Sequence, residues 1–506
     1  MSLFVANCIA LLSAAPVVRA HVFGAKKVRQ PVVAGSFYPA GAKSLSQTMD
    51  RFLEKTARAG IDGAIVAAVA PHAGYAYSGP VAACTYAALR GKKYTRVVVI
   101  APSHYAAFNY TSVYDGDGYA TPLGTIPVDT AFAQRLAKMN SGIRLGEEGH
   151  VPGKERGEHA IEVQLPWLQT VLESGFTLVP VVMGNQSYES SRALGLALAR
   201  LVHSENNHGK TLVLASSDLS HDHTGNEAES LDRKTLHALE NWDYFTMARN
   251  FGARVWEACG GGPVVAAMVY AERMGANRAE VLRYGHSGET SGDPSRVVGY
   301  SADVFVKSAH AAAAETPFVL SGEEKTELLG IARSSVESIV SHRQPYEPPV
   351  PASETLNREC GAFVTLTKNG ILRGCIGYTA AVKPLYMTLR DTATLAAMRD
   401  PRFSPVAAEE LPLLAYEISV LSPLRRVAQI EEIEIGRDGL LVKCGAHEGL
   451  LLPRVAVDQH WERTRFVEET CHKAGLRPDA WKSEETDIFR FTAEVFSGQG
   501  IVIAEQ

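Results

Sequence analysis

Histidines follow three apolar segments of the chain, at the point where each segment ends. AIVAAVAPHAG (64–74) leads into His72, RVVVIAPSHY (96–105) into His104, and TLVLASSDLSHDH (211–223) into Asp218 and His221. Imidazoles bind divalent metals and transfer protons near neutral pH. One histidine after a strand is usually an ordinary loop residue, but three at equivalent places predict a shared metal-binding or proton-transfer site.

Cys259 lies in a fourth segment with chemical interest, EACGGGPVVAAMVYAERMG (257–275). Pro263 suits the first position of a helix, and Gly260 to Gly262 suit the turn before it. Cys259 would then lie just ahead of a helix N-terminus, where the helix dipole favours the thiolate and lowers the pKa. The alternative is that Cys259 is a small buried side chain that fills space.

An α/β domain is expected over 28–307, because strands alternate with helical patterns. Expected strands are 64–70, 96–101, 178–183, 211–215 and 297–306, and their apolar runs show little alternation. Such strands are typical of a mostly parallel sheet covered by helices on both faces. Ligands gather outside the carboxyl ends of such strands, so we expect His72, His104 and His221 to converge there.

A helix is expected over EHAIEVQLPWLQTVLES (158–174), on which His159 and Glu162 share a face, as do Glu158 and Glu162. Two interpretations are open for these three residues. They orient metal ligands or contact the substrate, or they form a solvated acidic face.

The remaining chain predicts a smaller α+β domain at 321–506, after an alanine-rich linker at 308–320. Ser321 and Glu324 form a capping-box pattern before a helix, and Asn369-Gly370 is typical of a hairpin turn. Because the linker offers few large apolar residues, the two domains are expected to fold independently. Residues 1–27 are an N-terminal extension or a signal segment; we expect a cytoplasmic protein, with export as the alternative.

Composition excludes several classes of protein. The 506 residues exceed what one core usually organises, and 46% hydrophobic and 21% charged residues are ordinary for a globular protein. A net charge of −5 without Lys/Arg-rich runs gives no support for nucleic-acid binding. No later segment has the length of apolar sequence needed for a membrane span. Seven cysteines without a CxxC pair indicate reduced thiols.

The segment 30–306 resembles the Memo family. The motifs that carry the resemblance are VVAGSFYPAG, APHAGYAYSG, APSHY, PLGTIPVD, EHAIEVQLPWLQ and SSDLSHDH. Memo proteins are similar to the class III extradiol dioxygenases of the LigB type, non-haem iron enzymes that open catechol-like rings with O₂. The resemblance implies their mostly parallel sheet flanked by helices.

The same resemblance assigns roles to residues. It implies that His72, His104 and Cys259 are metal ligands, and that His221 is the catalytic base with Asp218 beside it. Tyr75 and Tyr105, near the ligating histidines, are expected to line the cavity for a small-molecule substrate.

Cys259 is where the sequence departs from the dioxygenases, which have a glutamate as the third ligand. Thiolate is softer than carboxylate, so copper or zinc competes better with Fe(II). The expected function is that of a metal-dependent oxidoreductase using Fe(II) or copper. A zinc-dependent hydrolase and a non-catalytic metal-binding adaptor are the alternatives.

The second part of the chain resembles the AMMECR domain family, through LRGCIG (372–377), RDPRFSP (399–405) and YEISVLSPL (416–424). That family is associated with Memo and radical-SAM proteins in the AmmeMemoRadiSam system, which implies a radical-SAM partner. Arg373 and Cys375 mark a candidate site in this domain. Cys375 is either a reactive thiol or a small side chain packed between glycines.

Overall fold

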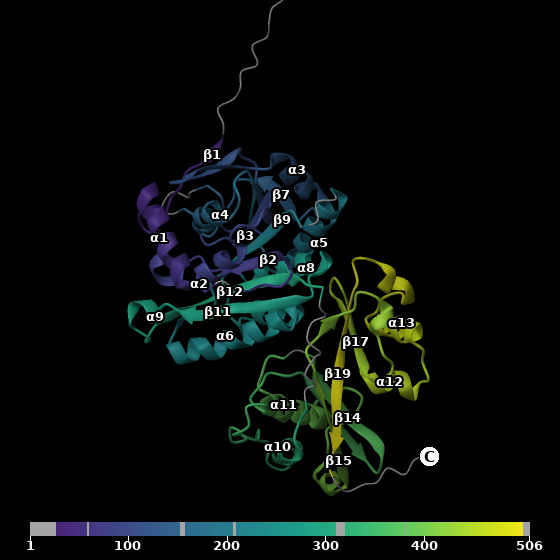
Figure 1. Cartoon of the computed structure of the whole chain (residues 1–506). Coiled ribbons are helices and arrows are strands. Elements are labelled where there is room, and N and C mark those ends of the chain that lie inside the picture. The colour runs from purple at the N-terminus through teal and green to yellow at the C-terminus, as the bar shows by residue number, and fades with distance from the viewer. Residues whose placement is uncertain are drawn as a thin grey trace, which may run out of the picture.

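A computed structural model describes residues 27–57, 60–151, 157–205, 209–309, 319–379 and 381–498. Except for Lys27, the expected N-terminal extension or signal segment lies outside these residues, as does most of the expected linker. Figure 1 shows two domains, each built on its own main sheet, with the end of α8 beside the second domain.

The main sheet of the first domain has the strand order β10-β12-β2-β9-β3-β8-β4-β7, with β11 paired to β12. The central strands β2, β9, β3 and β8 run parallel, while β12 and β4 join them antiparallel. A small sheet has the order β1-β5-β6. The bounds of these strands are β1 Val28–Arg29, β2 Ala64–Ala70, β3 Arg96–Pro102, β4 Thr111–Tyr114, β5 Gly118–Thr121, β6 Gly124–Pro127, β7 Ile143–Gly146, β8 Thr177–Met183, β9 Thr211–Ser216, β10 His221–His223, β11 Arg278–His286 and β12 Val297–Lys307.

Strand β3 shows why apolar and polar residues do not alternate along the central strands. Val98 and Ile100 pack into an apolar cluster with helices α3 and α5 to α8, while Val97 and Val99 pack on the other face with α1, α2 and α4. Each buried aliphatic side chain contributes about 1.5–3 kcal/mol. The helices are α1 Ala42–Lys55, α2 Tyr75–Leu89, α3 Thr130–Met139, α4 Leu165–Val171, α5 Tyr188–Ser204, α6 Gly225–Glu240, α7 Tyr244–Gly252, α8 Gly261–Arg273 and α9 Gly288–Ser291.

The helix expected over 158–174 is shorter than predicted. A 3₁₀ turn covers Glu162–Gln164 and α4 covers Leu165–Val171, so Glu158 and His159 lie in irregular chain. The Glu158 carboxylate accepts hydrogen bonds from the backbone N–H groups of His159 and Ala160, at 2.9 and 3.0 Å. Such local side-chain bonds compete with helix formation. Helix α8 begins at Gly261, so Pro263 is its third residue and not its first.

The second domain has an antiparallel sheet of order β14-β13-β15-β19-β17-β18, with β16 paired to β19. Ser321 and Glu324 form the predicted capping box, and Asn369 and Gly370 take the positive φ values of a tight hairpin turn, 52° and 78°. The elements are α10 Gly322–His342, β13 Ala362–Lys368, β14 Ile371–Tyr378, α11 Leu385–Met398, β15 Leu414–Leu421, β16 Arg425–Arg426, β17 Asp438–Cys444, β18 His447–Leu451, α12 Pro453–Asp458, α13 Arg463–Lys473 and β19 Asp487–Ser497.

The two domains meet through buried side chains as well as through the connecting chain. Phe245 of α7 stacks on Phe489 of β19, with ring centroids 5.2 Å apart, and both belong to one apolar cluster. Beside them, the buried Asp487 carboxylate accepts hydrogen bonds from Tyr188, at 2.8 Å, and from Arg192. The boundary between the domains is therefore a packed interface with a buried ion pair.

Candidate metal centre

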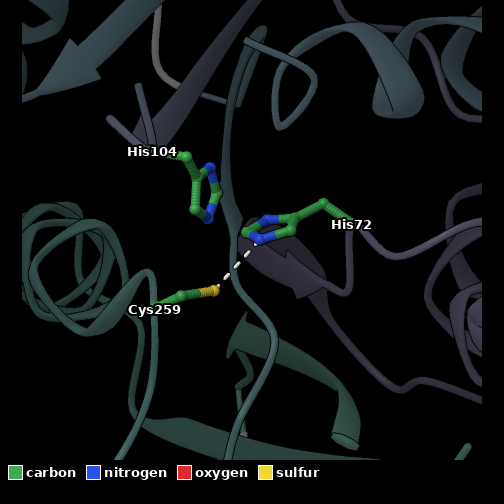
Figure 2. Close-up of side chains that lie close together, drawn as sticks. All are labelled: His72, His104 and Cys259. Carbon is green, nitrogen blue, oxygen red and sulfur yellow. Dashed lines mark hydrogen bonds between the residues drawn. The ribbon is translucent and has the colours of Figure 1, made fainter. Parts of the chain in front are cut away.

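Strands β2 and β3 deliver the two candidate histidine ligands to one edge of the sheet, and the turn before α8 delivers Cys259. Strand β9 lies between β2 and β3, and Ala70 at the end of β2 is in register with Ser216 at the end of β9. His72 and His104 each lie two residues beyond the end of their strand. Figure 2 shows both imidazoles and the Cys259 thiol gathered around one point, and their ligand atoms lie within 4.8 Å of one another. His72 and His104 thus lie together as expected, and the third group beside them is the Cys259 thiol and not the His221 imidazole.

His72 presents Nε2 to this point because its other ring nitrogen is occupied. Nδ1 lies 3.0 Å from Ser216 Oγ, which donates to the carbonyl of Ala160 and accepts from the Gln164 amide. Since the hydroxyl proton of Ser216 is already used, His72 must donate from Nδ1 and keep its lone pair on Nε2. Burial and the neighbouring His104 lower the pKa of His72 to about 3, so the ring stays neutral.

His104 is oriented in the same way by a carboxylate. Glu158 accepts from the backbone N–H of His104 at 2.7 Å, and its other oxygen lies 2.9 Å from Nδ1. Burial alone would lower the pKa of His104, but this bond together with the charges of Glu158 and Asp218 raises it. Burial alone would raise the pKa of Glu158, but the bond and charge of His104 together with backbone N–H donors hold it at about 2. With Nδ1 donating to Glu158, Nε2 is the nitrogen left for a ligand. The side chain is 26% exposed, so this is the open side of the site.

Cys259 is held by a turn fastened at both ends. Gln186 donates to the Cys259 carbonyl and accepts from Gly262, both at 2.9 Å, while Ser217 Oγ accepts from Gly260 at 3.0 Å. Sγ lies 3.0 Å from His72 Nε2.

The expected lowering of the Cys259 pKa is wrong for the metal-free protein. Burial, together with the nearby Asp218 carboxylate, raises the pKa of the thiol well above its usual value. The backbone N–H of Asp218 donates to Sγ at 3.3 Å, but this contact does not offset burial. A bound cation would have to supply the charge that stabilises the thiolate.

Asp218 and His221 lie at the third strand end, but they are not hydrogen-bonded as a pair. Asp218 Oδ1 accepts from the backbone N–H of His72 at 2.7 Å, and burial raises the pKa of this carboxyl. His221 is exposed, and its Nδ1 lies 2.9 Å from the carbonyl of Leu219. The charge of His221 still lowers the pKa of His72, which places His221 at the rim of the site. Asp218 thus positions the His72 backbone and does not orient His221.

The residues predicted around the ligands separate into two groups. His159 stacks on His104 with ring centroids 4.8 Å apart, and the exposed Tyr105 lies 6.2 Å from His159. Burial, followed by the charge of His72, lowers the pKa of His159 to about 4. Its Nδ1 is buried and has no hydrogen-bond partner among the described residues.

Tyr75 and Glu162 instead belong to the core. The Tyr75 hydroxyl donates to the Val163 carbonyl at 2.6 Å, and its buried ring packs near Trp167. Glu162 is fully buried and accepts from Arg29 and Tyr38, at 2.6 and 2.7 Å. Neither the solvated acidic face nor the cavity lining by Tyr75 is found, because both side chains tie the N-terminal segment and α2 to the 158–164 loop.

The two candidate residues of the second domain, Arg373 and Cys375, hold the segment 399–410 in place. Arg373 binds Glu410 through Nε and Nη2, at 3.0 and 2.9 Å. The backbone N–H of Cys375 donates to Asp400, and Cys375 Sγ lies 3.3 Å from the Thr365 hydroxyl. These contacts fasten the 399–410 segment to the hairpin.

Sequence reasoning did not find the residues that set the ligand geometry. Five side chains make hydrogen bonds that hold the chain around the candidate ligands and His221. They are Ser216, Gln164, Ser217, Gln186 and Glu257. Only Ser216 and Ser217 carried a signal, because they precede Asp218 in the SSDLSH motif.

The fold and these contacts define a class of protein: an α/β protein with a candidate metal centre of two histidines and one cysteine at the edge of its sheet. The chain belongs to the Memo family, since residues 29–304 match the family described as Memo-like protein, and it carries an AMMECR1 domain matched over 329–496. It is 36% identical over 279 residues to a MEMO1 family protein of Methanosarcina mazei, covering 54% of this chain and 98% of that one.

The second domain has relatives of its own. The chain is 42% identical over 179 residues to the Thermococcus kodakarensis protein TK0174, covering 33% of this chain and 87% of that one. Among solved structures, the uncharacterized protein PH0010 from Pyrococcus horikoshii is 39% identical over 34% of this chain and 90% of that chain, with a TM-score of 0.33. Among the described residues, no helix is both long and apolar enough to cross a membrane.

Proposed function

We propose that this protein is a metal-dependent oxidoreductase of the dioxygenase-like type, with Fe(II) or copper held by His72, His104 and Cys259. The observation that supports it is the arrangement of the two imidazoles. Each histidine has Nδ1 committed to a neighbour and Nε2 directed to the point where Sγ also lies. Two imidazole nitrogens and one cysteine sulfur suit a borderline or soft divalent metal.

The residues around the proposed metal ligands would admit the substrate and transfer its proton. Bound Fe(II) or copper would supply one-electron chemistry with O₂. His104 marks the open side, and the exposed Tyr105 lies near it, where a small-molecule substrate would enter. His221, exposed at the rim, would accept or return the substrate proton through Nε2, because Nδ1 is held by a backbone carbonyl.

Metal analysis after anaerobic purification tests the proposal. We expect one Fe or Cu per chain in the wild type, consumption of O₂ with a catechol-like substrate, and loss of the metal in the double variant His72→Ala/His104→Ala. Full metal retention in the double variant would refute the site. One zinc per chain with no O₂ consumption would favour the hydrolase, since the same ligands suit zinc. A stably bound metal with neither activity would favour the adaptor.

His221→Ala tests the assignment of the base. General acid–base help is typically worth about 10²–10⁴ in rate. We therefore expect kcat to fall within that range while metal content stays at the wild-type level. Loss of metal in His221→Ala together with its retention in His104→Ala would reverse the two roles.

We also propose that the protein works in the cytoplasm with a radical-SAM partner, as the association of Memo and AMMECR families implies. Co-purification of the full chain with a radical-SAM protein from its own host, under anaerobic conditions, tests this. Recovery of the mature chain from the exported fraction would contradict the location.

A further inference from the structure

The second domain contacts the segment that leads into Cys259. This segment, residues 249–260, runs from the last turn of α7 to the residue before α8. Arg249 lies 3.2 Å from Glu448, and the Asn250 amide donates to the Ala381 carbonyl at 2.9 Å. Trp256 Nε1 donates to Glu359 Oε2 at 2.7 Å. The second domain thus holds the segment at three positions.

The bond between Trp256 and Glu359 joins two side chains that are almost fully buried. The Glu359 side chain is 6% exposed and Trp256 is 5% exposed. Glu359 Oε1 also accepts from Lys234 of α6, at 2.6 Å. A buried carboxylate must keep such partners, because loss of either leaves polar groups without water or a hydrogen bond. Glu359 therefore fixes the Trp256 ring relative to α6.

From Trp256 the chain reaches the candidate site within three residues. Glu257 accepts from the backbone N–H of His221 at 3.3 Å and lies 3.0 Å from His223 Nε2. Cys259 follows two residues later, with Sγ 3.0 Å from His72 Nε2. A displacement of Trp256 would pass along the backbone to the contact with His221 and to the thiol.

We propose that Glu359 of the second domain is a positioning residue for the metal centre of the first, acting through Trp256 to place Cys259 and the His221 strand. This inference rests on the proposed metal site. It assigns the AMMECR1 domain a part in building that site: the domain supplies no ligand and fixes the position of one.

Two variants that each remove one donor to a buried carboxylate of the second domain test the proposal. Trp256→Phe removes the indole N–H that binds Glu359 together with part of the buried ring, and Tyr188→Phe, on α5, removes the hydroxyl that binds Asp487. Variants of Glu359 leave the indole intact and therefore separate loss of the hydrogen bond from loss of ring volume. Co(II) is titrated anaerobically into the metal-free full chain, and the thiolate-to-cobalt charge-transfer band reports ligation by Cys259. We expect Trp256→Phe to weaken Co(II) binding about 10–100-fold and reduce the band, as loss of supporting bonds typically does. Tyr188→Phe should leave both unchanged.

Alkylation of Cys259 in the metal-free protein tests the positioning role of Glu359 independently of metal binding. In the metal-free protein, Cys259 should be alkylated faster in Trp256→Phe than in the wild type or Tyr188→Phe, because the turn is less well held. If the wild type binds no Co(II) but this difference persists, the metal site fails and the positioning role stands. Equal alkylation in the three proteins, or equal weakening of Co(II) binding by both variants, would overturn the positioning role.

Glu359→Gln provides a second variant if Trp256→Phe does not fold. The amide keeps an acceptor for Trp256 but loses the charge that binds Lys234. We therefore expect Glu359→Gln to weaken Co(II) binding less than Glu359→Leu does. Indistinguishable Co(II) binding in the wild type, Glu359→Gln and Glu359→Leu would also overturn the proposal.

Discussion

The sulfur of Cys259 is the feature of the candidate centre that most constrains its metal. A carboxylate at this position would present hard oxygen, so we expect Cys259→Glu to shift preference from copper toward Fe(II). Cys259→Ala should weaken binding of every divalent metal. Competition titrations with Cu and Fe(II) check this, with Cys84→Ser on α2 as the control, because Cys84 is also partly buried but lies outside the ligand group. Unchanged preference in Cys259→Glu would show that Cys259 is no ligand.

Asp303 is a buried acid outside the candidate centre that should set part of the pH dependence of stability. It is fully buried in β12, Ser301 donates to Oδ2 at 2.8 Å, and Oδ1 has no hydrogen-bond partner among the described residues. Burial, opposed by the Ser301 bond and reinforced by the charge of Glu240, raises the pKa of Asp303 to about 7. The folded protein therefore keeps this proton where the unfolded chain, with a pKa of 3.8, has lost it.

The sign of the effect follows from this difference in bound protons. The contribution of Asp303 to stability falls as pH rises from about 4 through about 7, by about 1.4 kcal/mol for each unit of pKa difference. Asp303→Asn mimics the protonated acid, so we expect it to unfold at higher urea than the wild type at pH 8 and at the same urea near pH 4. Parallel pH profiles for the two proteins would contradict this.

The turn 258–262 is the element that the site depends on most closely. A Cβ at Gly260 would lie 2.3 Å from the Ser216 carbonyl oxygen and 2.7 Å from Ser217 Cβ, while a Cβ at Gly252 would have nothing within 4 Å. We expect Gly260→Ala to push the turn away from β9, lower the melting temperature and abolish metal binding. Gly252→Ala, at the end of α7, should keep metal and leave stability equal or slightly higher. Normal metal content in Gly260→Ala would show that the turn tolerates displacement.

Among the secondary-structure elements, the strand ends were predictable from the sequence, but the irregular chain between the elements was not. His72 and His104 converge because two parallel strands of seven residues, built mainly from apolar side chains, precede them, and such apolar runs are visible in a sequence. Glu158 and His159 follow a helix-like pattern, yet the Glu158 carboxylate binds its own backbone neighbours instead. The raised pKa of Cys259 depends on burial by distant segments, which sequence position near a helix end does not reveal.

For the whole molecule, the packed interface alters the expectation that the domains fold independently. Phe245 and Phe489 share one apolar cluster, and the buried Asp487 carboxylate accepts a hydrogen bond from Arg192. Separating the domains would expose these rings and leave the carboxylate without its partner. No apolar signal in the linker could have predicted this, because the contacts come from α5, α7 and β19.

A cut chain tests the interface. A protease site placed between residues 309 and 319 should yield fragments that stay associated after cleavage and elute together in size-exclusion chromatography. Asp487→Asn should weaken this association, and Glu323→Gln, an exposed acid at the start of α10, should not. Elution of the cleaved wild type as two independent, cooperatively melting fragments would support the original expectation of independent folding.

The strand order has a consequence for the order of events during synthesis. Cys259 is made 187 residues after His72, and β9, which separates β2 from β3 in the finished sheet, is also made after both. At about 5–20 residues per second, the nascent chain carries both histidines for roughly 8–30 s before the thiol exists. Until residue 216 the ribosome-bound chain lacks the central strand β9, and until residue 259 it lacks the third candidate ligand. A metal held by all three residues would therefore be acquired only after translation has passed residue 259.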